Sequence, residues 1–256
     1  MEWMSEMSEG KECFYGNKRR TILTERLRLP IAGAVLCLAV IIRGICFPEQ
    51  ESFPLERVLK SSETIIDYAI ENNKAFLLVS TVKELGFGDL FLVLERKGEE
   101  QWVRVYENDF TLLKPWKLEL GDVDGDGITD ILTAVRKTTH YDPKERNRLF
   151  IFNYQEAGLV KKWTGSDIAG NWMDFEVGEL VDTKGEEIVF LSREEEGREK
   201  LLAYAWYDFG FLMLAQSEEY EGISSVELCG GNLLRLTHSK GEDYLMLNEN
   251  KIVKAE

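Results

Sequence analysis

The sequence predicts an all-β protein: a β-propeller-like array of about four four-stranded blades, preceded by one N-terminal transmembrane helix. Three observations predict it: an apolar run near the N-terminus, many short strand-like segments separated by turn residues, and a four-strand pattern that recurs every 46–57 residues. We divide the chain into a cytoplasmic tail (1–28), a transmembrane signal anchor (29–47), a linker (48–63) and a β-propeller-like domain (64–256).

The predicted anchor begins with an uncharged run, residues 29–42, and continues past Arg43 to Phe47. A run of this length spans a bilayer as a helix, and an arginine near its end can extend its charge to the interface. Basic residues precede it: Lys18, Arg19, Arg20, Arg26 and Arg28. This asymmetry places the N-terminus in the cytoplasm and the β domain on the outer side of the cell membrane. A cleaved signal peptide and a buried core helix are the alternatives.

The repeat is clearest in two segments, "KLELGDVDGDGITDILTAV" (117–135) and "DFEVGELVDTKGEEIVFLS" (174–192). Each has alternating apolar residues, a glycine, an acidic loop and a β-rich strand, and each is followed by two more strands around a turn. Similar units precede and follow. The second strands of the four units centre near Phe76, Ile131, Ile188 and Leu234. Four-stranded units at this spacing are typical of propeller blades.

Two alternatives remain open for this architecture. The units could form an open stack of meanders, or a propeller that another chain completes. Residues 55–73 also match a helical period, which would place a short helix between the membrane and the first unit. Pro48 and Pro54 mark the linker.

The loop "GDVDGDGITDIL" (121–132) concentrates negative charge. Its acidic residues occupy positions 1, 3, 5 and 9: Asp122, Asp124, Asp126 and Asp130. Gly127 at position 6 suits a sharp turn, and Ile128 at position 7 can offer its backbone carbonyl. Hard oxygen ligands in a flexible loop suit Ca²⁺, which would also remove the repulsion among the carboxylates. An Asp/Gly-rich turn that binds nothing is the alternative.

An EF-hand is excluded because Thr133 stands where a bidentate glutamate is needed and the following segment is β-branched. The segment "DVDGDGITD" resembles the D-x-D-x-D-G-x-x-D loop of FG-GAP/VCBS repeats, the kind found in integrin alpha-chain propellers. This resemblance implies that the loop joins two strands of a blade and binds calcium. The implied ligands are Asp122, Asp124, Asp126, Asp130 and the Ile128 carbonyl. The other units lack the motif, so one site per chain is expected.

Composition and motifs narrow the range of functions that the sequence could have. A net charge of −15 does not suit nucleic acid, whose phosphates need a basic surface. The only histidines, His140 and His238, are expected on the surface, and no catalytic motif appears, so we do not expect an enzyme. Tryptophans recur near strand ends, either as packing between units or as a surface for glycan or protein: Trp102, Trp116, Trp163, Trp172 and Trp206.

The expected function is therefore a membrane-anchored, extracytoplasmic, calcium-binding module that binds protein or glycan. The alternatives are a structural subunit of an envelope assembly and a carbohydrate-active enzyme. Four cysteines, of which only Cys229 certainly belongs to the outer domain, do not predict a disulfide framework.

Overall fold

The computed structural model describes residues 55–82, 86–98, 101–140, 142–165, 167–182, 184–194 and 197–255. These residues form sixteen β-strands and one 3₁₀ turn (Glu56–Val58), so the predicted all-β class is confirmed. The predicted cytoplasmic tail and anchor lie outside the described residues. Within the described part of the chain, no helix has the length and apolar character needed to cross a membrane.

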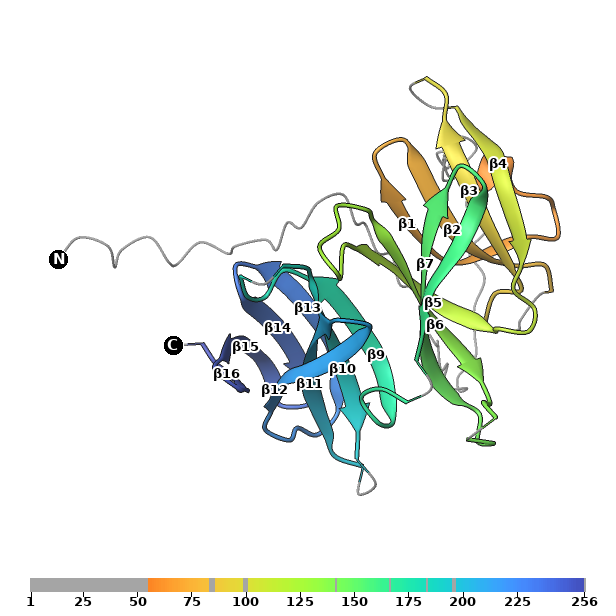
Figure 1. Cartoon of the computed structure of the whole chain (residues 1–256). Coiled ribbons are helices and arrows are strands. Elements are labelled where there is room, and N and C mark those ends of the chain that lie inside the picture. Colours follow the sequence, from red (N-terminus) through yellow and green to blue (C-terminus); the bar gives the residue numbers. More distant parts are fainter. Residues whose placement is uncertain are drawn as a thin grey trace, which may run out of the picture.

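Two four-stranded antiparallel sheets contain the first half of the domain (Figure 1). Unit 1 consists of β1 (Thr64–Glu71), β2 (Lys74–Ser80), β3 (Leu90–Arg96) and β4 (Trp102–Asp109). Unit 2 consists of β5 (Pro115–Gly121), β6 (Asp130–Lys137), β7 (Arg146–Gln155) and β8 (Gly158–Thr164). The helical alternative for residues 55–73 is wrong for residues 64–71, which form β1.

The second half forms one eight-stranded sheet. Unit 3 consists of β9 (Trp172–Gly178), β10 (Glu187–Arg193), β11 (Glu199–Tyr207) and β12 (Gly210–Ser217). Unit 4 consists of β13 (Ile223–Gly230), β14 (Leu233–His238), β15 (Gly241–Asn248) and β16 (Lys251–Lys254). Cys229 lies in β13, and the other three cysteines, at positions 13, 37 and 46, lie outside the described residues.

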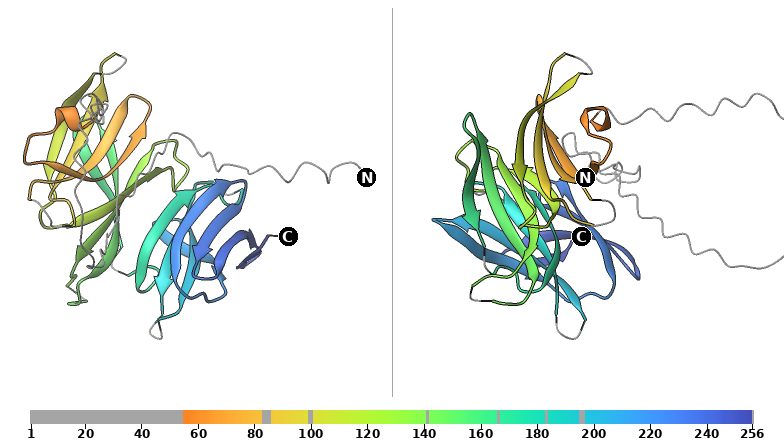
Figure 2. Two further views of the ribbon diagram at one scale, coloured as in Figure 1. Left: turned by 180° about the vertical axis from the view of Figure 1, so that it is seen from behind. Right: turned by 90° about the vertical axis from the view of Figure 1, so that its right-hand side faces the viewer.

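The last two units differ from the separate blades that the sequence predicts. β12 and β16 pair in parallel through Gln216↔Lys251 and Ser217↔Ile252. β9 and β13, at the two ends of this sheet, also contact each other. The sheet therefore curls into a nearly closed barrel, which satisfies backbone groups that two separate blades would expose at their edges. Figure 2 shows the three sheets in sequence order, with unit 1 and the barrel at opposite ends.

Irregular strand pairing repeats from unit to unit. In units 1, 2 and 3 the pairing of the first two strands skips one residue, and so does the pairing of the last two. The residues skipped in the first strand of each unit are Ile66, Trp116 and Met173. Those skipped in the last strand are Val105, Lys162 and Leu214. A β-bulge bends its strand and redirects a side chain, so the three units share this geometry as well as strand order.

The core lies between the sheets and inside the barrel. The central strands β2, β6 and β10 are buried along most of their length because another layer covers each of their faces. Units 1 and 2 enclose Phe76, Phe91 and Phe110. Units 2 and 3 enclose Trp172 and Phe175, among others. Each such side chain contributes about 1.5–3 kcal/mol when it is fully buried.

A charge cluster around the buried side chain of Lys117 joins units 2 and 3. The Nζ atom of Lys117, on β5, lies 2.6 Å from Asp174 Oδ1 and 2.8 Å from Glu176 Oε1, both on β9. The carboxylate of Glu119 is 3.6 Å away. Pairing with several carboxylates compensates the cost of burying the ammonium group, and it fixes the alignment of the two strands.

Candidate functional site

The aspartate loop connects β5 to β6, and the pairing of Gly121 with Asp130 closes it. Gly125 and Gly127 have φ values of 64° and 83°, which only glycine adopts at little cost. These two glycines turn the chain back toward its start. The side chains at alternate positions can therefore converge, as the sequence pattern predicts.

The structure brings together three of the predicted ligands. One carboxylate oxygen each from Asp122, Asp124 and Asp130 lies within 4.8 Å of the other two. The Asp126 carboxylate is not part of this group of three. Its Oδ1 accepts the backbone N–H of Ile128 at 2.8 Å. The Ile128 side chain is exposed. Oxygen donors at this spacing suit a hard divalent cation.

Backbone hydrogen bonds hold the loop in shape. The carboxylate of Asp122 accepts the N–H groups of Asp126 at 3.1 Å and Gly127 at 2.8 Å. Asp124 Oδ1 accepts the Asp126 N–H at 3.3 Å. These contacts hold the carboxylates of Asp122 and Asp124 in place, which lowers the cost of ordering them when a metal ion binds.

Asp130 is fully buried at the first position of β6. Its carboxylate accepts hydrogen bonds from the Val123 N–H at 3.1 Å and from Asn153 Nδ2 at 2.7 Å. Burial raises the pKa of Asp130 above its ordinary value, although hydrogen bonds from Lys162, Asn153 and Val123 oppose that rise. The charged form of this carboxylate therefore depends on its partners.

Lys162 is the partner that sequence reasoning missed. Its Nζ lies 2.8 Å from Asp124 Oδ2, 2.8 and 3.0 Å from the two oxygens of Asp130, and 3.7 Å from Asp126 Oδ2. Burial opposes the charge of Lys162, but its hydrogen bonds to Asp124 and Asp130 outweigh this and raise its pKa. Only the pairing of β8 with β7 brings this lysine to the loop, so no local sequence signal could identify it.

The equivalent loop of unit 3 packs against the aspartate loop. Asp122 donates its N–H to Glu186 Oε2 at 2.7 Å, and Glu186 returns its own N–H to the Asp122 carbonyl at 2.9 Å. A Cβ atom on Gly125 would lie 2.0 Å from the Lys184 carbonyl oxygen. On the other side, Thr129 Oγ1 donates to Glu71 Oε1 of unit 1 at 2.7 Å. The loop is therefore supported by both neighbouring units.

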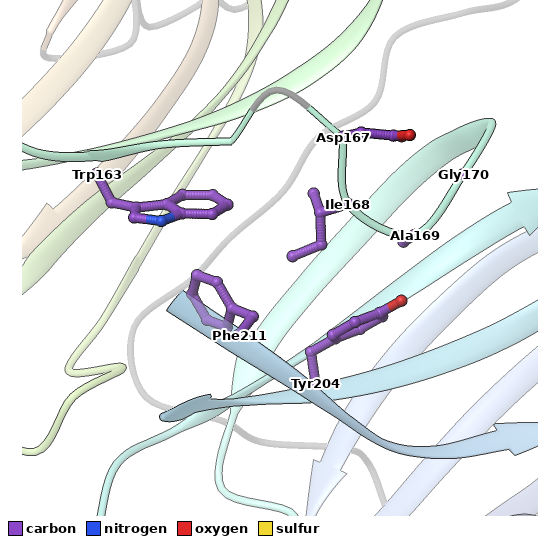
Figure 3. Close-up of a pocket in the computed structure, with 7 residues that line it drawn as sticks. All are labelled: Trp163, Asp167, Ile168, Ala169, Gly170, Tyr204 and Phe211. Atoms are coloured by element: carbon purple, nitrogen blue, oxygen red, sulfur yellow. The ribbon is translucent and has the colours of Figure 1, made fainter. Parts of the chain in front are cut away.

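An aromatic pocket of about 280 Å³ opens between units 2 and 3. Figure 3 shows the rings of Trp163, Phe211 and Tyr204 around Ile168. The other lining residues are Asp167, Ala169 and Gly170. The Trp206 ring packs against Trp163, with centroids 6.4 Å apart, and lies 6.0 Å from Lys162 Nζ. The pocket thus adjoins the aspartate loop through consecutive residues of β8.

The recurring tryptophans have different surroundings. Trp172 is 1% exposed and its ring lies 6.1 Å from that of Trp116, so these two are packing residues. Trp163 lines the pocket. His238, expected on the surface, has a side chain only 10% exposed, and its Nε2 lies 3.1 Å from Asp243 Oδ2.

No known family model matches the sequence, and no curated protein is similar enough to show a relative.

Proposed function

We propose that the chain is a membrane-anchored, extracytoplasmic binding module that binds one Ca²⁺ in the aspartate loop and a protein or glycan ligand beside it. The convergence of Asp122, Asp124 and Asp130 within 4.8 Å is the observation that carries this proposal. Asp126 and the Ile128 carbonyl complete the proposed ligand set. The four-stranded units with shared bulges favour a propeller-like origin for the domain.

Calcium fits the chemistry of these donors better than magnesium does. Calcium accepts six to eight oxygens in flexible geometry, whereas magnesium requires a near-ideal octahedron and retains more of its water. The donors come from a loop with both carboxylate and carbonyl oxygens, and Glu186 and Thr129 tie that loop to its neighbours. Bound calcium would therefore stabilise the contacts among units 1, 2 and 3.

The aromatic pocket supports the ligand-binding part of the proposal. Aromatic rings offer flat apolar faces to a sugar ring, and the Asp167 carboxylate can accept hydrogen bonds from its hydroxyl groups.

The predicted span at residues 29–47 supports anchoring of this module to a membrane, with the β domain outside. The acidic composition is suited to cations and does not suit nucleic acid.

Calcium binding is tested by thermal unfolding of the chain in detergent, with calcium, magnesium or EDTA. A site with Kd near 10⁻³ M adds about 1.4 kcal/mol at ten times Kd, which is a rise in Tm of about 3–5 °C. Asp124→Ala should abolish that rise. Asp182→Ala, an exposed aspartate in the equivalent loop of unit 3, should retain it. Absence of any calcium-dependent shift in the wild type would refute the metal site.

Ligand binding is tested by glycan-array binding and by quenching of tryptophan fluorescence. Trp163→Ala should abolish binding of any glycan that the wild type retains. Trp102→Ala in unit 1, where Arg96 lies 5.7 Å from the ring, is the matched control and should leave binding unchanged. Equal loss in both variants would refute the pocket as the binding site.

A structural subunit of an envelope assembly is the second candidate. The exposed apolar side chains of unit 3 favour it: Tyr207, Phe209, Leu212 and Met213, with Phe209 81% exposed. A complex that co-purifies with the wild type and is lost in Phe209→Ser would support this role over binding of a soluble ligand.

A further inference from the structure

The ammonium group of Lys162 occupies the place where the loop carboxylates converge. Its closest contacts are with Asp124 and both oxygens of Asp130, all at 2.8–3.0 Å. Its side chain is 13% exposed, and the Asp130 carboxylate that it contacts is fully buried. This arrangement matches a buried ion pair rather than a surface contact, because removing the cation would leave an uncompensated buried charge.

Lys162 lies at a β-bulge that recurs in units 1, 2 and 3, and this bulge places its side chain beside the loop. Lys162 is skipped in the β7–β8 pairing, since Ile151 pairs with Trp163 and Phe152 pairs with Lys161. Units 1 and 3 have the same bulge, with Val105 and Leu214 at the skipped position. A bulge redirects the side chain of its extra residue. Among these three units, the one with the aspartate loop is therefore also the one with a cation at the bulge.

The ammonium group contacts two of the three carboxylates that a metal ion would need, those of Asp124 and Asp130. Calcium lies 2.3–2.6 Å from each of its ligands. Asp124 Oδ2 lies 2.8 Å from Nζ, so an ion bound to that oxygen would lie no more than about 5.4 Å from the present position of Nζ, where two positive charges repel in a buried site. Occupancy by one cation therefore opposes occupancy by the other.

We propose that Lys162 is the resident cation of the aspartate loop, that it holds the loop folded without metal, and that a divalent cation binds only by displacing it. The displacement half of this inference rests on the proposed calcium function, whereas the resident-cation half does not. The Trp206 ring, whose centroid is 6.0 Å from Nζ, offers the displaced ammonium group a favourable face beside the aromatic pocket.

The test compares Lys162→Met with Lys161→Met. Lys161 is the adjacent, exposed lysine of β8, so both variants lose one positive charge from the same strand. Without metal, Lys162→Met should lower Tm by about 10 °C, and Lys161→Met should leave it nearly unchanged. Calorimetric titration should show calcium binding about tenfold tighter to Lys162→Met than to wild type. Calcium should also restore most of the lost Tm in Lys162→Met.

The possible outcomes test the resident-cation part and the displacement part of the inference separately. Equal Tm values for Lys162→Met and Lys161→Met would overturn the resident-cation assignment. Equal calcium affinity in wild type and Lys162→Met would overturn displacement. A large loss of Tm in Lys162→Met that millimolar calcium does not restore would support the resident cation and refute the calcium function. If Lys162→Met does not fold in EDTA, refolding in calcium but not magnesium supports the inference, and Lys162→Arg should fold in both.

Discussion

The loops between the first and second strands of unit 2 and unit 3 share one hydrogen-bonding arrangement but carry different side chains. In both, a buried carboxylate at the first residue of the second strand accepts a backbone N–H from the start of the loop. Asp130 accepts that of Val123 at 3.1 Å, and Glu187 accepts that of Leu180 at 2.8 Å. The two loops therefore share a frame in which one buried carboxylate accepts a backbone N–H from the start of the loop.

The other side chains of the two loops differ. The unit 2 loop gathers its carboxylates around Lys162, whereas Leu214 stands at the equivalent bulge in unit 3. The unit 3 loop directs Glu186 across to the Asp122 N–H. Unit 2 thus provides a charged site and unit 3 provides its support. A repeated frame leaves the residues that do not maintain it free to specialise.

The largest effect should come from separating the two loops. Gly125→Ala places a Cβ atom 2.0 Å from the Lys184 carbonyl oxygen at a residue with positive φ, so backbone must move. We expect a loss of about 3 kcal/mol in unfolding free energy, measured by urea titration. Gly127→Ala has positive φ but nothing within 4 Å of its Cβ, and should lose about 1 kcal/mol. Equal losses would mean that the loops do not pack as described.

A smaller effect should follow removal of the hydrogen bond between the loops. Glu186→Ala leaves the Asp122 N–H without its carboxylate acceptor. A hydrogen bond to a charged group contributes about 1.5–3 kcal/mol, and we expect a loss near 2 kcal/mol in urea unfolding. The exposed Glu179, in the same loop, gives the control Glu179→Ala, which should change stability by less than about 0.5 kcal/mol.

A third prediction concerns the ion pair between Asp142 and Arg148 in unit 2 and its dependence on pH. The hydrogen bond from Arg148 holds the pKa of Asp142, in the β6–β7 loop, below its ordinary value of 3.8. A lowered pKa contributes stability that is present above pH 3.8 and is lost as the pH falls through the folded-state value. Asp142→Asn should therefore lose less stability than wild type on acidification, measured by thermal unfolding between about pH 5 and 2. Parallel curves would contradict the pairing.

The smallest effect on stability should come from the exposed hairpin tip of unit 3. Phe209 is 81% exposed, whereas the equivalent tip of unit 2, residues 155–158, contains no aromatic residue. Phe209→Ser should change unfolding free energy by less than about 0.5 kcal/mol. A larger loss would show that this side chain packs against the domain and is not available to a partner.

Much of the architecture could be read from the sequence. Alternating and continuous apolar runs predicted the strands, and the match between residues 117–135 and 174–192 predicted equivalent units. Local spacing also predicted that Asp122, Asp124, Asp126 and Asp130 would converge, because a loop of nine residues closed by two paired strands brings alternate side chains together. The structure groups three of them, Asp122, Asp124 and Asp130. These features depend on residues close in the chain.

Other features depended on the tertiary structure. The parallel pairing of β12 with β16, which joins units 3 and 4 into a barrel, depends on strand edges that local patterns do not describe. The approach of Lys162 to the loop depends on a bulge in the pairing of β7 with β8. The sequence by itself determined the strands, the repeats and the acidic loop, because short-range periodicity and turn residues encode them. Only the tertiary structure decided which units merge and which cation meets the aspartates, because contacts between distant strands determine both.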